Sequence, residues 1–199
     1  MRPVNAVHHA AAATVLLGAG CGNQVASATF DGAVHGLSLQ PKDAISAPAT
    51  VAFTTGSAPV AAIVITDAAG LCTKVSANLE PKSSLALLIF LADVNPSTGA
   101  IEAASGTGTF SVFVVGSGPA PRHFAVSSFG ANDAVCKEIA ADSADARSGS
   151  VTLTANGGGA YAGTYDLTFD SGDRVTGKFQ TATCQGLTTY LSRLTHGCG

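Results

Sequence analysis

The sequence predicts an all-β domain, built as an antiparallel β-sandwich of about ten strands with one or two short helices. The 199 residues include 23 glycines, no tryptophan and only 12% charged side chains, a composition typical of many turns and small side chains. From residue 29 onward, short runs of strand-forming residues are interrupted by Gly, Pro, Asn and Asp. A β-barrel is the alternative architecture, because the same strand pattern fits both.

Ten segments carry the strand pattern. They are residues 28–40, 50–55, 60–66, 72–78, 85–92, 108–115, 123–129, 151–155, 161–169 and 174–183. The pattern is clearest near the C-terminus, where Tyr165, Leu167 and Phe169 alternate with polar neighbours and the alternation resumes after a short turn. Residues 150–184 are therefore expected to form a three-stranded antiparallel meander with one face in the core.

Three other segments have distinctive patterns. Residues 85–92, LALLIFLA, are apolar at every position and predict a strand that is covered on both faces. Residues 187–194 place four apolar side chains at helical spacing and predict a short helix that packs on the sheet. Residues 136–147 contain helix formers but few large apolar side chains, so they predict a short surface helix or a structured loop.

The first 20 residues predict an export signal. Arg2 is the only charged side chain before Asp31, and residues 10–19 form an apolar run that is too short to span a bilayer. Residues 17–21, LGAGC, resemble the lipobox of bacterial lipoproteins, in which the cysteine becomes a lipid-bearing N-terminus. We expect a lipoprotein signal peptide at 1–20 and lipid attachment at Cys21.

The remaining boundaries follow from this assignment. Residues 21–28 are small and uncharged, as in a flexible tether, and residues 29–199 are expected to form a single β-rich domain. An alternative cleavage site is the ASA tripeptide at 26–28. Cleavage after Ala28 would release a soluble, secreted protein instead of a tethered one.

Four cysteines remain after Cys21 is set aside, and they are Cys72, Cys136, Cys184 and Cys198. Four cysteines in an oxidising compartment predict two disulfide bonds, with three possible pairings. We favour Cys72 with Cys136 and Cys184 with Cys198, because the second pair closes a short terminal loop. Their isolated positions do not match the paired ligands of a structural zinc site.

Neither a catalytic motif nor a metal or cofactor motif is present in the sequence. The G-x-S-x-G and H-E-x-x-H motifs are absent, and the three histidines beyond residue 9 (His35, His123 and His196) are far apart. Asp170 and Asp173 lie in a DSGD segment that fits a tight turn better than a calcium loop. The net charge of −3 and the scattered Lys and Arg argue against a nucleic-acid partner.

Residues 148–184, SGSVTLTANGGGAYAGTYDLTFDSGDRVTGKFQTATC, resemble the C-terminal region of small uncharacterised bacterial lipoproteins that contain SGTVTLT, GTYDLTF and GDxVTGxFxxxxC strands. The resemblance implies an exported, mostly β envelope protein with disulfide bonds. Gly22 follows Cys21, and by resemblance to lipoprotein sorting rules the absence of aspartate at this position favours the outer membrane.

We therefore expect a non-catalytic lipoprotein of the cell envelope, attached to the outer membrane through Cys21, with a role in binding, adhesion or structural support. One alternative is a β-barrel carrier in which residues 60–65 and 85–92 line a cavity for an apolar ligand. The other is an exported hydrolase, which requires a nucleophile, a base and an orienting carboxylate to converge in a cleft.

Overall fold

The structure, a computed structural model, describes residues 26–53 and 56–199. The expected signal peptide and Cys21 lie outside these residues. The strands of the described part are β1 (Ser27–Ala28), β2 (Asp31–Gly32), β3 (Asp43–Phe53), β4 (Gly56–Thr66), β5 (Leu79–Glu80), β6 (Ser84–Val94), β7 (Ile101–Ala103), β8 (Gly108–Val112), β9 (His123–Asn132), β10 (Ala144–Gly157), β11 (Ala160–Phe169), β12 (Arg174–Gln180), β13 (Ala182–Thr183) and β14 (Gly197–Cys198). The helices are α1 (Leu71–Ser76), α2 (Gln185–Leu191) and a 3₁₀ turn (Ala140–Asp142).

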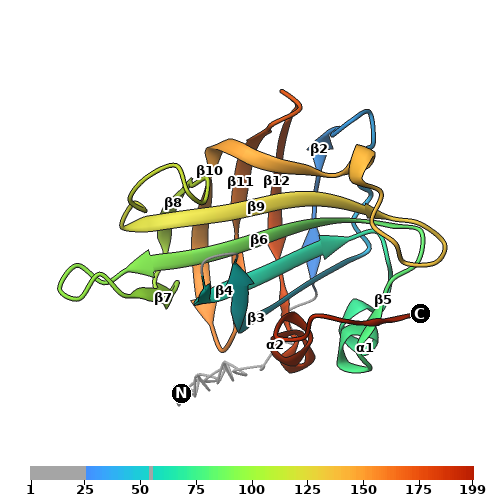
Figure 1. The fold of residues 1–199 in the computed structure, drawn as a ribbon, viewed down its shortest axis with the longest axis horizontal. Helices are drawn as coiled ribbons and strands as arrows, with labels where there is room; N and C mark the ends of the chain where they lie inside the picture. Colours follow the sequence, from blue (N-terminus) through green and yellow to red (C-terminus); the bar gives the residue numbers. More distant parts are fainter. Residues whose placement is uncertain (1–25, 54–55) are drawn as a thin grey trace, which may run out of the picture.

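The predicted all-β class is confirmed. Within the described residues, twelve strands form one mixed sheet in the order β1-β12-β11-β10-β8-β9-β6-β4-β3-β13, with β2 on β12 and β7 on β6. The sheet curls into a half-barrel, so that β10, β11 and β12 run across the back of β4, β6 and β9 (Figure 1). The two layers expected of a sandwich are therefore two halves of one continuous sheet. The predicted meander at 150–184 is present as β10, β11 and β12.

The long strand β10 joins the two halves. It pairs with β11 along its length, and its first residues, Ala144 and Asp145, also pair with β9. The β10–β11 register shifts between Ala146 and Ser148, next to Gly149 at φ +116°. A side chain at Gly149 would collide with the Asp166 carbonyl group, so this bulge requires glycine. Bulges increase local twist, which lets β10 follow the curl of the sheet.

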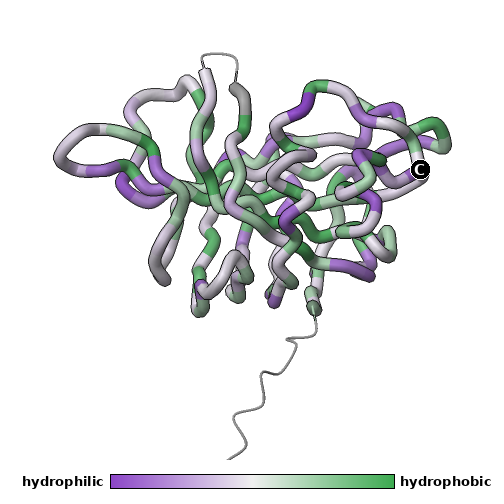
Figure 2. The backbone as a smooth tube through the Cα atoms, turned by 90° about the horizontal axis from the view of Figure 1, so that it is seen from below, coloured by the Kyte–Doolittle hydropathy of each residue, from purple (hydrophilic) through white to green (hydrophobic). Residues whose placement is uncertain are grey.

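The space between the two halves of the sheet is the main hydrophobic core, and the hydrophobic segments run through the middle of the molecule (Figure 2). Leu87, Ile89 and Leu91 of β6 enter it with no exposed surface. Aromatic rings fill much of the rest, and Phe129 contacts Phe169 at a centroid distance of 6.4 Å. The interior of the half-barrel is therefore packed with side chains.

Three sequence-based assignments need correction. Residues 28–40 do not form one strand, because only Ala28 and the two residues of β2 lie in strands and a tight turn between Val34 and Leu37 reverses the chain after them. Residues 72–78 do not form a strand, because most of them belong to the helix α1. Leu71 and Val75 are one helical turn apart, so the helix buries both side chains on the same face. The expected tether at 21–28 is too long, since Ser27 and Ala28 form β1 and pair with Gln180 and Phe179. By contrast, the helix expected at 187–194 is present as α2, and residues 136–147 form a loop with one 3₁₀ turn before β10 begins.

All four cysteines outside residues 1–25 form disulfide bonds, as expected, but the predicted pairing is wrong. The bonds are Cys72–Cys184 and Cys136–Cys198. The helices α1 and α2 lie side by side (Figure 1). Cys72 of α1 therefore lies close to Cys184, the residue before α2. Parallel pairing of β14 with β5 brings Cys198 beside Glu80, and the Sγ atom of Cys136 lies 3.3 Å from the Glu80 carbonyl oxygen.

Two disulfide bonds indicate an oxidising, extracytoplasmic environment. Among the described residues, every helix is too short or too polar to cross a lipid bilayer.

Candidate functional site

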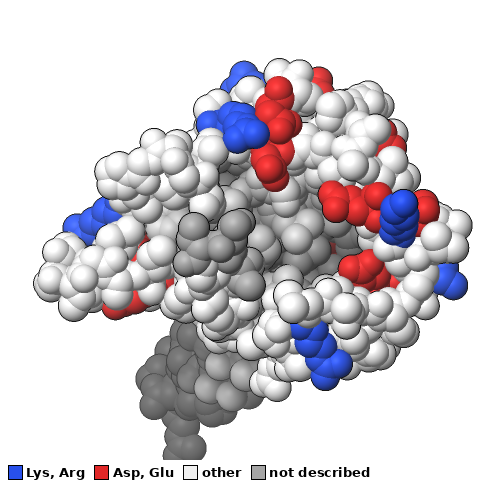
Figure 3. Space-filling model, in the orientation of Figure 1, with Lys and Arg blue, Asp and Glu red and all other residues white. Residues whose placement is uncertain are grey.

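The outer face of β4, β6 and β9 carries a cleft of about 640 Å³. Side chains alternate along these strands, so Leu87 and Ile89 point into the core while Ala86 and Leu88 point outward. Val64, Ala86 and Leu88 form the apolar part of its floor, and Thr66 of β4 and Ser128 of β9 also line it. Figure 3 shows the hollow on this face, with acidic side chains around it. The volume lies within the range of pockets that hold small molecules, about 300–1,000 Å³.

The helices α1 and α2 form one wall of the cleft. Leu71 and Val75 come from α1, and Leu187, Tyr190 and Leu191 come from α2. These side chains cover part of the apolar outer face of the sheet and form a second hydrophobic cluster with it.

Several contacts fix this wall in place. The Leu71 N–H donates to Asp43 Oδ2 at 2.8 Å, and Thr188 Oγ1 donates to the Pro48 carbonyl oxygen at 2.6 Å, so both helices are tied to β3. A Cβ atom at Gly186 would overlap Ser76, which shows that glycine permits the close approach of α1 and α2. The bond between Cys72 and Cys184 then locks the two helices together.

A second wall, which meets the first, is formed by β5, the start of β6 and the end of β9 with the loop that follows it. Glu80, Pro81 and Asn132 line the cleft together with Cys136. The backbone here is held tightly, because the Gly197 N–H donates to the Asn78 carbonyl and the Gly199 N–H donates to the Glu80 carbonyl, both at 2.9 Å. The bond between Cys136 and Cys198 closes this wall, so each of the two walls contains one disulfide.

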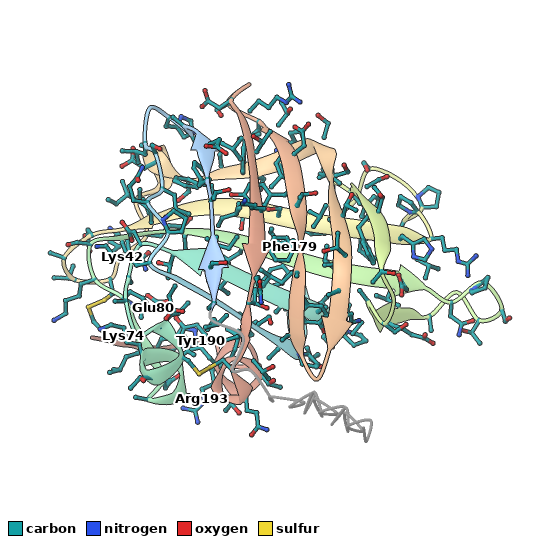
Figure 4. The ribbon with its side chains drawn as sticks, turned by 180° about the vertical axis from the view of Figure 1, so that it is seen from behind. Lys42, Lys74, Glu80, Phe179, Tyr190 and Arg193 are labelled. Atoms are coloured by element: carbon teal, nitrogen blue, oxygen red, sulfur yellow. A yellow bond between two sulfur atoms is a disulfide. The ribbon has the colours of Figure 1, made fainter. Side chains whose placement is uncertain are left out.

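A group of polar side chains lies where the two walls meet. The rings of Tyr190 and His196 stack at a centroid distance of 3.8 Å, and His196 Nδ1 lies 3.0 Å from Asn78 Oδ1. Glu80 lies next to Tyr190 (Figure 4). Burial raises the pKa of Tyr190 above its ordinary value, and the charge and hydrogen bonding of Glu80 raise it further. The Tyr190 hydroxyl is therefore neutral at physiological pH.

The charged side chains that line the cleft are all acidic. They are Glu80, Glu138, Asp145 and Asp170. Asp170 is paired with Arg147 at 3.4 Å. In the described part of the chain, the other three make no ion pair with a Lys or Arg side chain within 4.0 Å. The cleft thus combines an apolar floor with a carboxylate-bearing rim.

Most of this site was not predicted from the sequence. Cys136 was expected to form a disulfide, but nothing indicated that it lines a cleft. Glu80 and Glu138 have no distinctive sequence setting, and His196 lies 58 residues or more from either glutamate along the chain. The available signal was the outward face of the LALLIFLA strand, which is apolar but only half covered in the structure.

The other histidines lie in different settings. His123 Nδ1 is 2.7 Å from Asp93 Oδ1, across neighbouring strands β9 and β6. This pair has the base and the orienting carboxylate of a hydrolase, but among the described residues His123 forms no hydrogen bond with a Ser, Thr or Cys side chain. The His35 backbone N–H donates to Asp173 Oδ2 at 2.9 Å.

The DSGD turn uses its carboxylates for local structure. Hydrogen bonds from the His35 N–H and from the Ser171 hydroxyl lower the pKa of Asp173. Within residues 26–53 and 56–199, no three His, Cys, Asp or Glu side chains are grouped so that they could hold a metal ion.

A second, smaller hollow of about 110 Å³ lies toward the other end of the same outer face. Its lining is apolar and includes Val60, Phe90 and Val126, with Ile101 and Val115 partly exposed at its edge. It lacks the convergent polar groups of the larger cleft, which is therefore the better candidate for a specific ligand site.

Comparison of the chain with models of protein families, with curated protein sequences and with solved structures finds no match in any of the three.

Proposed function

We propose that this protein is a non-catalytic lipoprotein of the bacterial cell envelope that binds a small ligand in the cleft on the outer face of its sheet. The observation that carries the proposal is the cleft itself, with a volume of about 640 Å³ and a disulfide bond in each wall. Fixed walls reduce the conformational entropy that is lost when a ligand binds, so such a site is preorganised.

The position of the cleft distinguishes this proposal from a barrel carrier. Residues 60–65 and 85–92 are the strands that a carrier would use, but their inward side chains, such as Ile63 and Leu87, are fully buried against the opposite half of the sheet. Their outward side chains line the cleft instead, with Val64 and Leu88 in its floor. The ligand site of this proposal is thus on the outside of the half-barrel.

Attachment through lipid on Cys21 is supported by the extent of β1. Cleavage after Ala28 would remove Ser27 and Ala28, which pair with Gln180 and Phe179. Cleavage before Cys21 keeps β1 and leaves residues 21–26 ahead of it. Two or three acyl chains on this cysteine make detachment from the membrane negligible, and Gly22 favours the outer membrane.

The tether is tested by intact mass spectrometry of the protein from native membranes. We expect a mature chain that begins at Cys21 and carries acyl groups. Cys21→Ser is expected to abolish both the lipid and the membrane association. Ala26→Leu disrupts the ASA tripeptide but leaves Cys21 in place, so it is expected to change neither. An unmodified N-terminus at Thr29 contradicts the proposal.

The binding role is tested by identifying molecules that copurify with the native protein. Ala86 lies in the floor of the cleft, so Ala86→Phe is expected to fill the site and remove the bound molecule. Ala100→Phe is the matched control, because Ala100 is exposed in a turn outside the cleft. Equal amounts of the molecule on both variants, or none on the wild-type protein, contradict the binding role.

A further inference from the structure

We propose that the ligand of the cleft is an organic cation with an apolar body, whose positive group lies beside Glu80 and whose hydrocarbon part lies on Val64, Ala86 and Leu88. This inference rests on the proposed binding function and deepens it by naming the chemical class of the ligand. Three features of the cleft lead to it: the sign of its charges, the fixed position of Glu80 and the apolar floor.

The first feature is the sign of the charge. Four carboxylate side chains line the cleft, and no Lys or Arg among residues 26–53 and 56–199 lines it. Within these same ranges Asp170 alone of the four is balanced by an ion pair, with Arg147. Charges of one sign inside a concave site reinforce one another and attract a ligand of the opposite sign. An anionic ligand would instead be repelled by Glu80, Glu138 and Asp145.

The second feature is the rigidity of Glu80. Its carbonyl oxygen accepts a hydrogen bond from the Gly199 N–H at 2.9 Å, through the pairing of β5 with β14. The Cys136–Cys198 bond lies against the same carbonyl group, with Sγ of Cys136 at 3.3 Å. Tyr190 lies next to the Glu80 side chain (Figure 4). The carboxylate is therefore held at the cleft wall before any ligand arrives.

The third feature is the floor. Ala86 and Leu88 of β6 are half-buried and present hydrocarbon to the cleft, next to Val64 of β4. Small inorganic or highly polar cations gain nothing from such a surface, whereas a hydrocarbon chain or ring gains about 25 cal/mol for each Å² that it removes from water. The acidic side chains and the apolar floor of the cleft together favour a ligand that is both cationic and partly apolar.

Three probes with similar unbranched hydrocarbon chains separate charge from hydrophobicity. Octyltrimethylammonium is the cation, octanoate is the anion and 1-octanol is the neutral reference. Binding is followed by amide chemical shifts in two-dimensional NMR spectra, which also report where each probe binds. We expect octyltrimethylammonium to shift the resonances of residues 86–88 and 190, with an affinity about tenfold higher than that of 1-octanol and with octanoate weakest. Added salt is expected to reduce this difference.

The role of Glu80 is tested with matched variants. Glu80→Gln keeps the size of the side chain and is expected to weaken octyltrimethylammonium binding about fivefold to tenfold without affecting 1-octanol. Glu102→Gln removes the same charge from β7, outside the cleft lining, and is expected to have little effect. Glu138→Gln, in the exposed loop after β9, provides a second test if Glu80→Gln does not fold.

The outcomes separate this inference from the binding function. Equal affinity for the three probes in the cleft, or no difference between Glu80→Gln and Glu102→Gln, overturns the choice of a cation but leaves the cleft as a ligand site. Shifts confined to residues outside the cleft overturn the cation and, together with the absence of a copurifying molecule, the binding function.

Discussion

The two faces of strands β4, β6 and β9 are both apolar, but they are covered in different ways. On the inner face, Ile63, Leu87 and Ile89 are fully buried by the opposite half of the sheet. On the outer face, Leu88 and Phe90 are only half-buried and line hollows. An apolar strand face therefore becomes core or binding surface according to the element that covers it, and the sequence of the strand alone does not decide which.

The elements that cover the two faces differ in their own stability. The inner face is covered by β10, β11 and β12, which pair with one another along most of their length. The outer face is covered by helices of six and seven residues, which are too short to be stable alone. Disulfide bonds and hydrogen bonds to β3 hold these helices and the C-terminal segment in place. We expect perturbations of the two faces to have separable effects on stability and on the cleft.

The largest separable effect is expected from the disulfide next to the cleft. Replacing Cys136 and Cys198 together with serine removes a link between residues 62 positions apart, and loop closure predicts a loss of about 4 kcal/mol in the free energy of unfolding. Hydrogen exchange is expected to speed up in residues 192–199 and around Glu80, while β10, β11 and β12 stay protected. Equal acceleration throughout the sheet contradicts a local role for this bond.

Truncation of neighbouring leucines compares the two faces directly. Leu87→Ala removes a fully buried side chain from the core and is expected to cost about 3 kcal/mol. Leu88→Ala, one residue along the same strand, removes a half-exposed side chain and is expected to cost about 1 kcal/mol. Urea unfolding measures both. Similar losses for the two variants show that the outer face is as important to folding as the core.

The elements that the sequence predicted well are those whose pattern is local. In the meander, Tyr165, Leu167 and Phe169 alternate with polar residues because one face of β11 is buried and the other is wet. The same rule failed at residues 72–78, where a single helical turn buries Leu71 and Val75 and leaves too short a period to recognise. Disulfide pairing failed for another reason, because it depends on which distant segments meet.

The cleft depends on contacts that are distant in the sequence. Glu80, Tyr190 and His196 meet only because β14 pairs with β5 and α2 packs against α1. LALLIFLA was expected to be covered on both faces; from Leu87 onward it is covered completely on the inner face, and it is covered partly on the outer face. The hydrophobicity of the strand predicted that both faces would be hidden from water. It did not predict that the helices on the outer face would leave the cleft uncovered.

A smaller effect is expected at a buried polar group that joins the two halves of the sheet. Ser46 Oγ on β3 donates to the Gly159 carbonyl oxygen at 2.7 Å and lies 2.6 Å from Thr181 Oγ1. Ser46→Ala removes two hydrogen bonds of about 1 kcal/mol each, while Thr181 Oγ1 keeps its hydrogen bonds with the Tyr161 backbone, so a loss of about 2 kcal/mol is expected in urea unfolding. Ser111→Ala, on the exposed side of β8, is the control and is expected to change little. If Ser46→Ala loses less free energy of unfolding than Ser111→Ala, the structural role of Ser46 is contradicted.

The smallest effects are expected from two hydroxyl groups, one in the core and one at the cleft. Tyr165 Oη, in the core, donates to the Thr29 carbonyl oxygen at 2.7 Å. Burial raises the pKa of Tyr165, and the nearby negative charge of Asp31 raises it further. Tyr165→Phe removes this hydrogen bond and is expected to cost about 1 kcal/mol near neutral pH.

The sign of the pH dependence follows from the raised pKa of Tyr165. Below about pH 10 both the folded and the unfolded chains keep the proton, so the hydroxyl contributes fully to stability. Above that pH the unfolded chain loses the proton first, and stability falls as the pH rises. Unfolding measured between about pH 9 and pH 11 is expected to show a shallower loss of stability with rising pH in Tyr165→Phe than in the wild-type protein.

Tyr190→Phe, at the cleft, also removes a hydroxyl with a raised pKa, but its partner Glu80 is half-exposed and regains water. Its loss near neutral pH is therefore expected to be smaller, and a loss equal to that of Tyr165→Phe would show that the cleft wall is as completely sealed as the core.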